Sequence, residues 1–128
     1  MRGTLPVMIG IGVDVVEIER FRLALARTPS MRSRLFTDVE LAYVEPKADP
    51  VPSLAARFAA REAIMKALGL GLGAFGFHDA WVEVEPSGAP RLVVTSRARE
   101  LAVDRGVVRW HVSLSHDGPV AIAMVVAE

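Results

Sequence analysis

An acidic residue interrupts one of the most apolar stretches of this chain. Asp14 lies inside residues 8–16, Met-Ile-Gly-Ile-Gly-Val-Asp-Val-Val. Removing a carboxylate from water costs free energy unless a partner compensates its charge. Two explanations remain open for Asp14 taken by itself. It could be a structural carboxylate that accepts hydrogen bonds from nearby backbone donors, or it could be a metal ligand.

A second charged pair lies in another apolar setting. Glu62 and Lys66 are four residues apart, so they share one face of an expected helix. Glu62 follows Phe58 by four residues and precedes Met65 by three, so it borders the apolar stripe of that helix. The pair is either an exposed ion pair of small energetic value or part of a functional site.

Taken together, these residues favour chemistry on phosphates. The chain has no cysteine, and its three histidines do not form a metal-binding pattern. Two carboxylates suit a hard cation such as Mg²⁺, which completes its shell with water and substrate phosphates. A lysine one helical turn from Glu62 suits a phosphate oxygen or the charge on a leaving phosphate.

One glycine pattern matches a dinucleotide-binding motif but lies in the wrong structural context. Residues 71–76 match G-x-G-x-x-G. The dinucleotide fingerprint follows a strand and opens a helix, whereas here a helix precedes the glycines and a strand follows. We therefore interpret residues 69–76 as a turning loop.

Two histidines bracket an expected strand near the end of the chain. His111 and His116 enclose Val-Ser-Leu-Ser, and His116 stands at the strand end beside a tight turn. Strand histidines are commonly structural, but residues at such turns often carry function. His116 is therefore the candidate of the two.

A basic cluster follows the apolar N-terminal stretch. No acidic residue intervenes between Arg20 and Thr37, and that interval holds five arginines. The cluster is either a solvated helix face or a docking surface for an acidic partner. Its members are Arg20, Arg22, Arg27, Arg32 and Arg34.

The elements that must position these residues follow from periodicity and turn residues. We expect strands over 9–18, 81–85, 91–95, 108–115 and 120–127, and helices over 19–27, 38–44, 53–68 and 96–105. Thr28 and Pro29 are expected to start a further turn, and Ser53 to cap the longest helix. Both faces of strand 120–127 look buried, and its small-residue face predicts very close packing. These elements make one α+β domain.

The composition narrows the class of protein. The chain has 128 residues, 52% hydrophobic and 23% charged, with zero net charge. A domain with its own core is expected. The absence of cysteine excludes a disulfide scaffold and a cysteine nucleophile and fits the cytoplasm. The net charge gives no indication of nucleic acid or membrane binding, and the interrupted N-terminal apolar run favours a strand over a signal peptide.

Three segments together resemble the holo-acyl-carrier-protein synthases. Residues 9–21, Ile-Gly-Ile-Gly-Val-Asp-Val-Val-Glu-Ile-Glu-Arg-Phe, resemble the opening motif of that family. Residues 57–67, Arg-Phe-Ala-Ala-Arg-Glu-Ala-Ile-Met-Lys-Ala, resemble its F-x-x-K-E-x-x-x-K helix, and residues 111–116 resemble its closing strand. Order and spacing agree from about residue 8 to the end, so residues 1–7 are expected to be a non-essential extension, with Met8 as an alternative start.

The resemblance implies a 4′-phosphopantetheinyl transferase. Such enzymes move phosphopantetheine from coenzyme A to a serine of apo-acyl carrier protein and release adenosine 3′,5′-bisphosphate. It also implies an α+β fold, with an antiparallel sheet packed on a long helix, assembled as a homotrimer with active sites between subunits. The small-residue face of 120–127 is compatible with close packing in such a trimer.

The resemblance also implies a role for each candidate residue. Asp14 and Glu62 would hold Mg²⁺ on the coenzyme A pyrophosphate, and Glu62 would help to deprotonate the carrier serine, directly or through water. Lys66 would neutralise charge as the bisphosphate leaves, and His116 would lie near the coenzyme A phosphates. Arg20 and Arg27 would dock the acidic helix of the carrier protein.

Two departures and two rival functions accompany the resemblance. The family usually has lysine at the positions of Arg61 and Ala89 in this chain. Arg61 keeps the positive charge, so little change is expected there unless the family's lysine has a geometric role. The rivals are a transferase for polyketide or other secondary-metabolism carriers and a non-catalytic carrier-binding scaffold. Transferases for secondary-metabolism carriers commonly have two lobes in a longer chain. The non-catalytic scaffold is disfavoured by the intact Asp14, Glu62 and Lys66.

Overall fold

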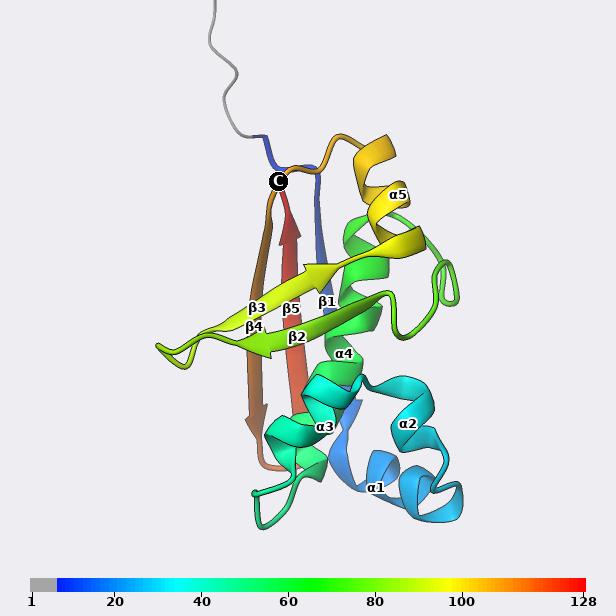
Figure 1. Cartoon of the computed structure of the whole chain (residues 1–128), viewed down its shortest axis with the longest axis vertical. Coiled ribbons are helices and arrows are strands. Elements are labelled where there is room, and N and C mark those ends of the chain that lie inside the picture. The colour runs from blue at the N-terminus through cyan, green and yellow to red at the C-terminus, as the bar shows by residue number, and fades with distance from the viewer. Residues whose placement is uncertain (1–6) are drawn as a thin grey trace, which may run out of the picture.

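The computed structural model describes residues 7–128, and its centre is a three-stranded antiparallel sheet packed on one long helix. The strand order is β1 (Gly10–Glu17), β5 (Val120–Ala127), β4 (Trp110–Asp117), and the helix is α4 (Val51–Ala67). Figure 1 shows α4 running along the sheet beside β1 and β5. The expected α+β fold is confirmed, and the expected non-essential extension falls outside the described residues except for Val7.

Small residues let the sheet and α4 approach closely. A Cβ atom on Gly12 would lie 1.8 Å from the carbonyl oxygen of Ala63, and one on Gly10 would lie 1.9 Å from that of Ala67. On β5, Ala121 and Ala123 are fully buried by the same packing. The predicted close packing is therefore present, but it lies within one chain, so this face does not serve assembly with another copy.

The opposite face of the sheet is exposed in the single chain. Ile11, Val13, Val15 and Met124 are each between 44 and 54% exposed. The expectation that both faces of the last strand are buried was therefore wrong for Met124. Alternating apolar residues on both sides made the strands look central, and the periodicity of a strand cannot tell a covered face from an uncovered one.

Three short helices close one end of α4. These are α1 (Ile18–Arg27), α2 (Met31–Leu35) and α3 (Asp38–Val44), and their apolar residues form a second core with the first half of α4. The predicted capping box of α3 is confirmed, because Thr37 and Glu40 each accept from the other's backbone N–H. The turn expected at residues 28–29 extends into α2, which begins at Met31 and not at Pro29.

The long helix begins two residues earlier than expected. Pro50 precedes its first residue, Val51, and Ser53 makes no cap hydrogen bond. Proline is tolerated in the first turn of a helix because the N–H groups there have no partner inside the helix. Pro52 lies in this first turn, so a proline just before the expected start is compatible with the earlier start of α4.

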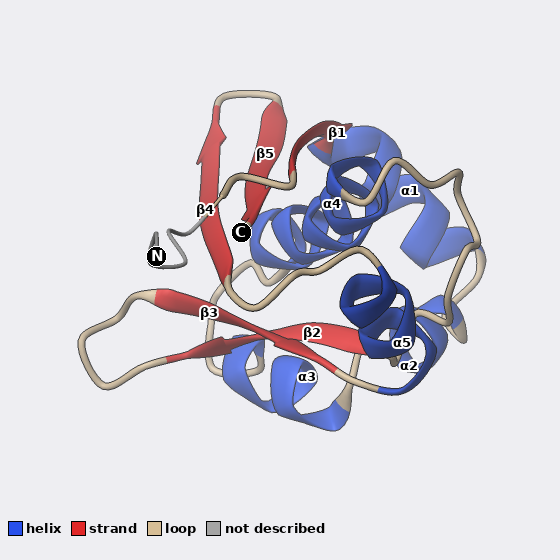
Figure 2. Cartoon of the chain, turned by 90° about the horizontal axis from the view of Figure 1, so that it is seen from above, coloured by secondary structure: helices blue, strands red, loops and turns tan. Residues whose placement is uncertain are grey.

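A separate hairpin covers the far side of α4. Strands β2 (Ala80–Val84) and β3 (Pro90–Val94) form a two-stranded sheet, followed by α5 (Ser96–Asp104). Figure 2 shows α4 lying between this hairpin and the three-stranded sheet. Within the described residues, no helix is both long and apolar enough to cross a membrane.

Candidate functional site

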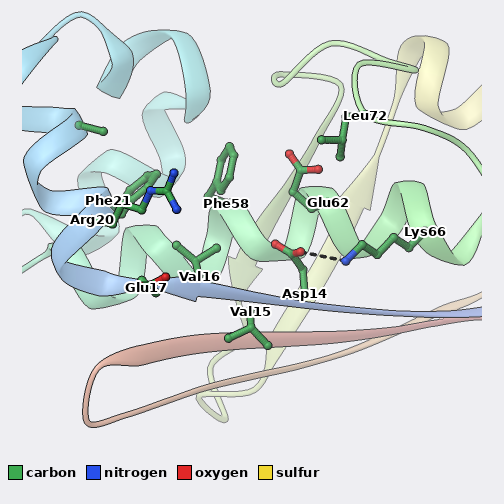
Figure 3. A pocket seen from close by; sticks show the side chains of 11 residues that line it. Asp14, Val15, Val16, Glu17, Arg20, Phe21, Phe58, Glu62, Lys66 and Leu72 are labelled. Atoms are coloured by element: carbon green, nitrogen blue, oxygen red, sulfur yellow. Dashed lines mark hydrogen bonds and ion pairs between the residues drawn. The ribbon is translucent and has the colours of Figure 1, made fainter.

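An open pocket of about 550 Å³ lies where β1, α1 and α4 meet. Its polar side carries Asp14 from β1 and Glu62 and Lys66 from α4. Its apolar side includes Phe21, Phe58 and Leu72. Figure 3 shows Lys66 directed at Asp14, with the Glu62 carboxylate nearby on the side of α4 that faces away from β1. The structure thus brings together the two places that the local sequence patterns could not connect.

Packing between β1 and α4 sets the spacing of these groups. Gly12 packs directly on the backbone of α4. Asp14 is the next residue on the same face of β1, so it also points toward the helix. Lys66 Nζ donates to Asp14 Oδ1 at 3.0 Å and to the carbonyl oxygen of Val13 at 3.0 Å. Asp14 therefore has a cationic partner, and the Glu62–Lys66 pair is not the simple exposed ion pair that spacing allowed.

Glu62 is the least compensated group of the site. Its side chain is buried, and within the described chain its Oε2 has no hydrogen-bond partner. Burial raises the pKa of Glu62, the charge of Asp14 raises it further, and Lys66 lowers it by a smaller amount. A second positive charge beside these carboxylates would stabilise the ionised form of Glu62 and lower its pKa.

The residues present fit Mg²⁺. A buried carboxylate oxygen without a donor, next to a second carboxylate, is a hard-oxygen site with unused acceptor capacity. No group of three or more histidine, cysteine, aspartate and glutamate side chains that could hold a metal is present among residues 7–128. A site with two protein ligands leaves positions for water and for a substrate phosphate, as Mg²⁺ prefers.

The raised pKa of Glu62 predicts a dependence of stability on pH. A carboxyl group with a higher pKa in the folded state favours folding at low pH and loses that contribution as pH rises through the folded pKa. Without divalent cations, we expect Glu62→Gln to unfold at higher urea concentration than the wild type at pH 7. Below about pH 4, where glutamate is protonated in both states, the difference should vanish. A wild type as stable as Glu62→Gln at pH 7 would contradict the raised pKa.

The two candidate docking arginines occupy different places on α1. Arg20 lines the pocket, whereas Arg27 lies exposed at the last turn of the helix. Arg22 is engaged elsewhere, since its guanidinium donates to both carboxylate oxygens of Asp49 at 2.9 and 2.8 Å. The basic cluster seen in the sequence is thus partly neutralised, and Arg20 is its member at the site.

His116 lies in a second pocket, on the other side of α4. This pocket is also lined by Arg57, Tyr43 and Lys47, and it shares no lining residue with the first. The Arg57 guanidinium lies 4.9 Å and the Lys47 ammonium 5.3 Å from the centre of the Tyr43 ring. Within one chain, therefore, the pocket of Asp14 does not include His116. Arg57 was not among the residues expected at a site, although it lies five residues before Glu62 on the same helix.

The glycine-rich segment forms a loop, as expected. Gly69 and Gly73 adopt φ angles of +70° and +82°, which glycine tolerates better than other residues. Leu72, which is 74% exposed, extends from this loop to the rim of the first pocket. No local pattern distinguished this leucine from an ordinary loop residue.

Comparison with known proteins identifies the family of this chain. The family model of the 4′-phosphopantetheinyl transferase superfamily matches residues 10–125. The chain belongs to this superfamily. The holo-acyl-carrier-protein synthase of Streptomyces avermitilis is 53% identical over 121 residues, which cover 94% of this chain and 98% of the relative. The family resemblance inferred from the three motifs is confirmed.

Solved structures of the superfamily share the fold over nearly the whole chain. The crystal structure of the Neisseria meningitidis holo-acyl-carrier-protein synthase has a TM-score of 0.86 and 31% identity, covering 95% of this chain and 99% of that one. The Helicobacter pylori synthase, solved in complex with coenzyme A, has a TM-score of 0.78 and 29% identity, covering 92% and 99%. The α+β architecture is therefore that of this group of transferases.

Proposed function

We propose that this protein transfers the 4′-phosphopantetheine group of coenzyme A to a serine of apo-acyl carrier protein and releases adenosine 3′,5′-bisphosphate. The observation that carries the proposal is the meeting of Asp14, Glu62 and Lys66 in one open pocket. The names of the relatives and the coenzyme A complex of one of them support the choice of substrates.

The reaction needs charge stabilisation more than a protein nucleophile. The carrier hydroxyl attacks the β-phosphorus of coenzyme A, and the bond to the bisphosphate leaving group breaks. Asp14 and Glu62 would hold Mg²⁺, which when bound supplies positive charge to the pyrophosphate. Lys66, which is half exposed, can turn from Asp14 toward the leaving phosphate. Glu62 Oε2, which has no hydrogen-bond partner within the described chain, is available to accept the proton of the serine hydroxyl directly or through water.

The apolar side of the pocket suits the carrier protein. Phe21 and Phe58 offer an apolar surface directly beside the carboxylates, and Arg20 adds a positive charge at its edge. A carrier helix with acidic residues around its serine would match both features. Arg27, two turns along α1, would extend the same docking surface.

We also propose that the enzyme is a homotrimer whose active sites each use two subunits. The exposed sheet face of Ile11, Val13, Val15 and Met124 is an apolar surface of the kind that interfaces bury. The pocket of His116 is also lined by the cations Arg57 and Lys47, which suits phosphate, but it is separate from Asp14. If His116 contacts coenzyme A, it must therefore come from a neighbouring copy.

We further propose that residues 1–128 act as one transferase domain in the cytoplasm, with residues 1–7 dispensable. The match of the family model to residues 10–125 supports the first part. The absence of cysteine supports a reducing compartment.

The decisive test of the function is a mass measurement on the carrier. Apo-acyl carrier protein incubated with coenzyme A, Mg²⁺ and this protein should gain the mass of phosphopantetheine on its serine. A parallel reaction with a chelator should leave the carrier unmodified. An unmodified carrier in the Mg²⁺ reaction would overturn the proposed activity, and modification in chelator would overturn the role of the metal.

The shared site predicts complementation between inactive variants. Glu62→Ala and His116→Ala damage different halves of the site, so each variant alone should transfer slowly. When the two are co-expressed in equal amounts, random assembly should make about a quarter of the sites intact, because each site draws its two halves from two neighbouring subunits. Mixed trimers as inactive as either parent would mean that both residues serve a site within one chain.

A further inference from the structure

A buried arginine beside Glu62 has no part in the proposed chemistry. Arg61 is only 1% exposed. Its Nε donates to the carbonyl oxygen of Phe77 at 2.7 Å, and its Nη1 donates to Glu40 Oε2 at 2.9 Å and to the carbonyl oxygen of Arg57 at 3.2 Å. Its Nη2 donates to the other oxygen of Glu40. The guanidinium is thus a bridge between separate parts of the chain.

The partner carboxylate is equally well fixed. Glu40 is fully buried in α3 and also accepts hydrogen bonds from the backbone N–H of Thr37 at 3.0 Å and of Val82 at 3.1 Å. The Arg61–Glu40 pair therefore ties α3, α4 and β2 together. A buried ion pair with its hydrogen bonds satisfied is a rigid element, since any displacement leaves a charge unpaired.

Arg61 holds both ends of a chain of four phenylalanine rings. Its guanidinium lies 5.3 Å from the centre of the Phe36 ring, and it binds the backbone of Phe77. Between these ends, ring centres are 6.2 Å apart for Phe36–Phe21, 5.4 Å for Phe21–Phe58 and 6.3 Å for Phe58–Phe77. Such separations are those of directly packed aromatic rings.

The middle two rings are the wall of the candidate active site. Phe21 and Phe58 line the pocket that holds Asp14 and Glu62, and Figure 3 shows them on its apolar side. The outer two rings, Phe36 and Phe77, do not line it. Arg61 does not line the pocket itself, and its contacts with Phe36 and Phe77 connect it to the two rings that do.

We propose that Arg61 is a positioning residue that sets the apolar wall of the pocket and thereby the binding of the carrier protein. The proposal rests on the proposed function, in which this wall receives the carrier helix. The planar guanidinium presents Nε and the two Nη groups along different edges, so it can bind Phe77 and Glu40 together. A lysine ammonium at this position can keep Glu40 but not both.

The environment of the Phe21 and Phe58 rings can be monitored without measuring activity. The chain has five phenylalanines, and the fifth, Phe75, lies in the other core cluster, where it serves as an internal control. In protein labelled with fluorophenylalanine, Arg61→Lys should shift the ¹⁹F resonances of Phe21 and Phe58 and leave that of Phe75 in place. Leu101→Ala, in the cluster of Phe75, should do the reverse. Unchanged Phe21 and Phe58 resonances in Arg61→Lys would overturn the proposal.

Steady-state kinetics then test the consequence. Arg61→Lys should raise KM for the carrier about fivefold, with kcat and KM for coenzyme A within about twofold of the wild type. Phe77→Leu, a change at a partly exposed end of the ring chain, should raise the carrier KM in the same direction. Leu101→Ala should leave all three constants unchanged at a temperature where it is folded. An unchanged carrier KM in both Arg61→Lys and Phe77→Leu would overturn the proposal.

The proposed function and the positioning role of Arg61 can be refuted separately. A wild type that does not modify the carrier would refute the proposed function, while the ¹⁹F resonances would still decide whether Arg61 positions the rings. A fully active wild type whose Arg61→Lys variant loses kcat without a change in carrier KM would refute the positioning role alone.

Discussion

Replacing Glu62 by alanine should lower the rate of phosphopantetheine transfer about 10³-fold while the fold survives. The side chain is buried, yet its Oε2 has no hydrogen-bond partner among the described residues, and its pKa is raised by burial and by Asp14. Its removal therefore costs no hydrogen bond at that oxygen and relieves an unfavourable charge. What is lost is the proposed ligand for Mg²⁺ and the proposed proton acceptor for the carrier serine.

Two measurements separate this outcome from unfolding. Mg²⁺ should raise the melting temperature of the wild type and not that of Glu62→Ala, because binding to the folded state alone stabilises it. Circular dichroism should show the same helix content in both. Glu100→Ala, an exposed carboxylate on α5 remote from the pocket, is the matched control and should behave as the wild type. A folded Glu62→Ala protein with near-normal turnover would contradict the metal site.

Replacing Gly12 by alanine should destabilise the protein by more than about 3 kcal/mol. The added Cβ would lie 1.8 Å from the carbonyl oxygen of Ala63 and 2.9 Å from the amide nitrogen of Ala67. These are backbone atoms of α4, so no side chain can rotate to make room. The strand and the helix must separate, and the Asp14–Lys66 contact should be lost with them.

Gly71→Ala is the matched control for this change. A Cβ on Gly71 meets no atom within 4 Å, and its φ angle is not in the left-handed region. Its free energy of unfolding should stay within about 0.5 kcal/mol of the wild type, whereas the urea midpoint of Gly12→Ala should fall steeply or the protein should fail to fold. Equal midpoints for the two variants would mean that β1 does not rest on α4 as described.

Local patterns predicted most elements, because helix and strand periodicity act over a few residues. The capping box at Thr37, the hairpin of β2 and β3 and the stop of the long helix after residue 67 lie within one or two residues of the prediction. The start of α4 was misplaced because proline signals a loop and a first helical turn equally well. The exposure of Met124 on the last strand was missed for a similar reason, since alternation defines faces but not what covers them.

The sequence by itself determined the chemical types of the site. An aspartate in an apolar strand and a glutamate and lysine one helical turn apart indicated a hard cation and phosphate chemistry, and the family motifs linked them. The tertiary structure alone decided the contacts across the chain: Gly12 on the backbone of α4, Lys66 on Asp14, His116 in a separate pocket and Arg61 on Glu40. These contacts join residues that are distant in sequence, where no local periodicity operates and packing of whole elements sets which groups meet.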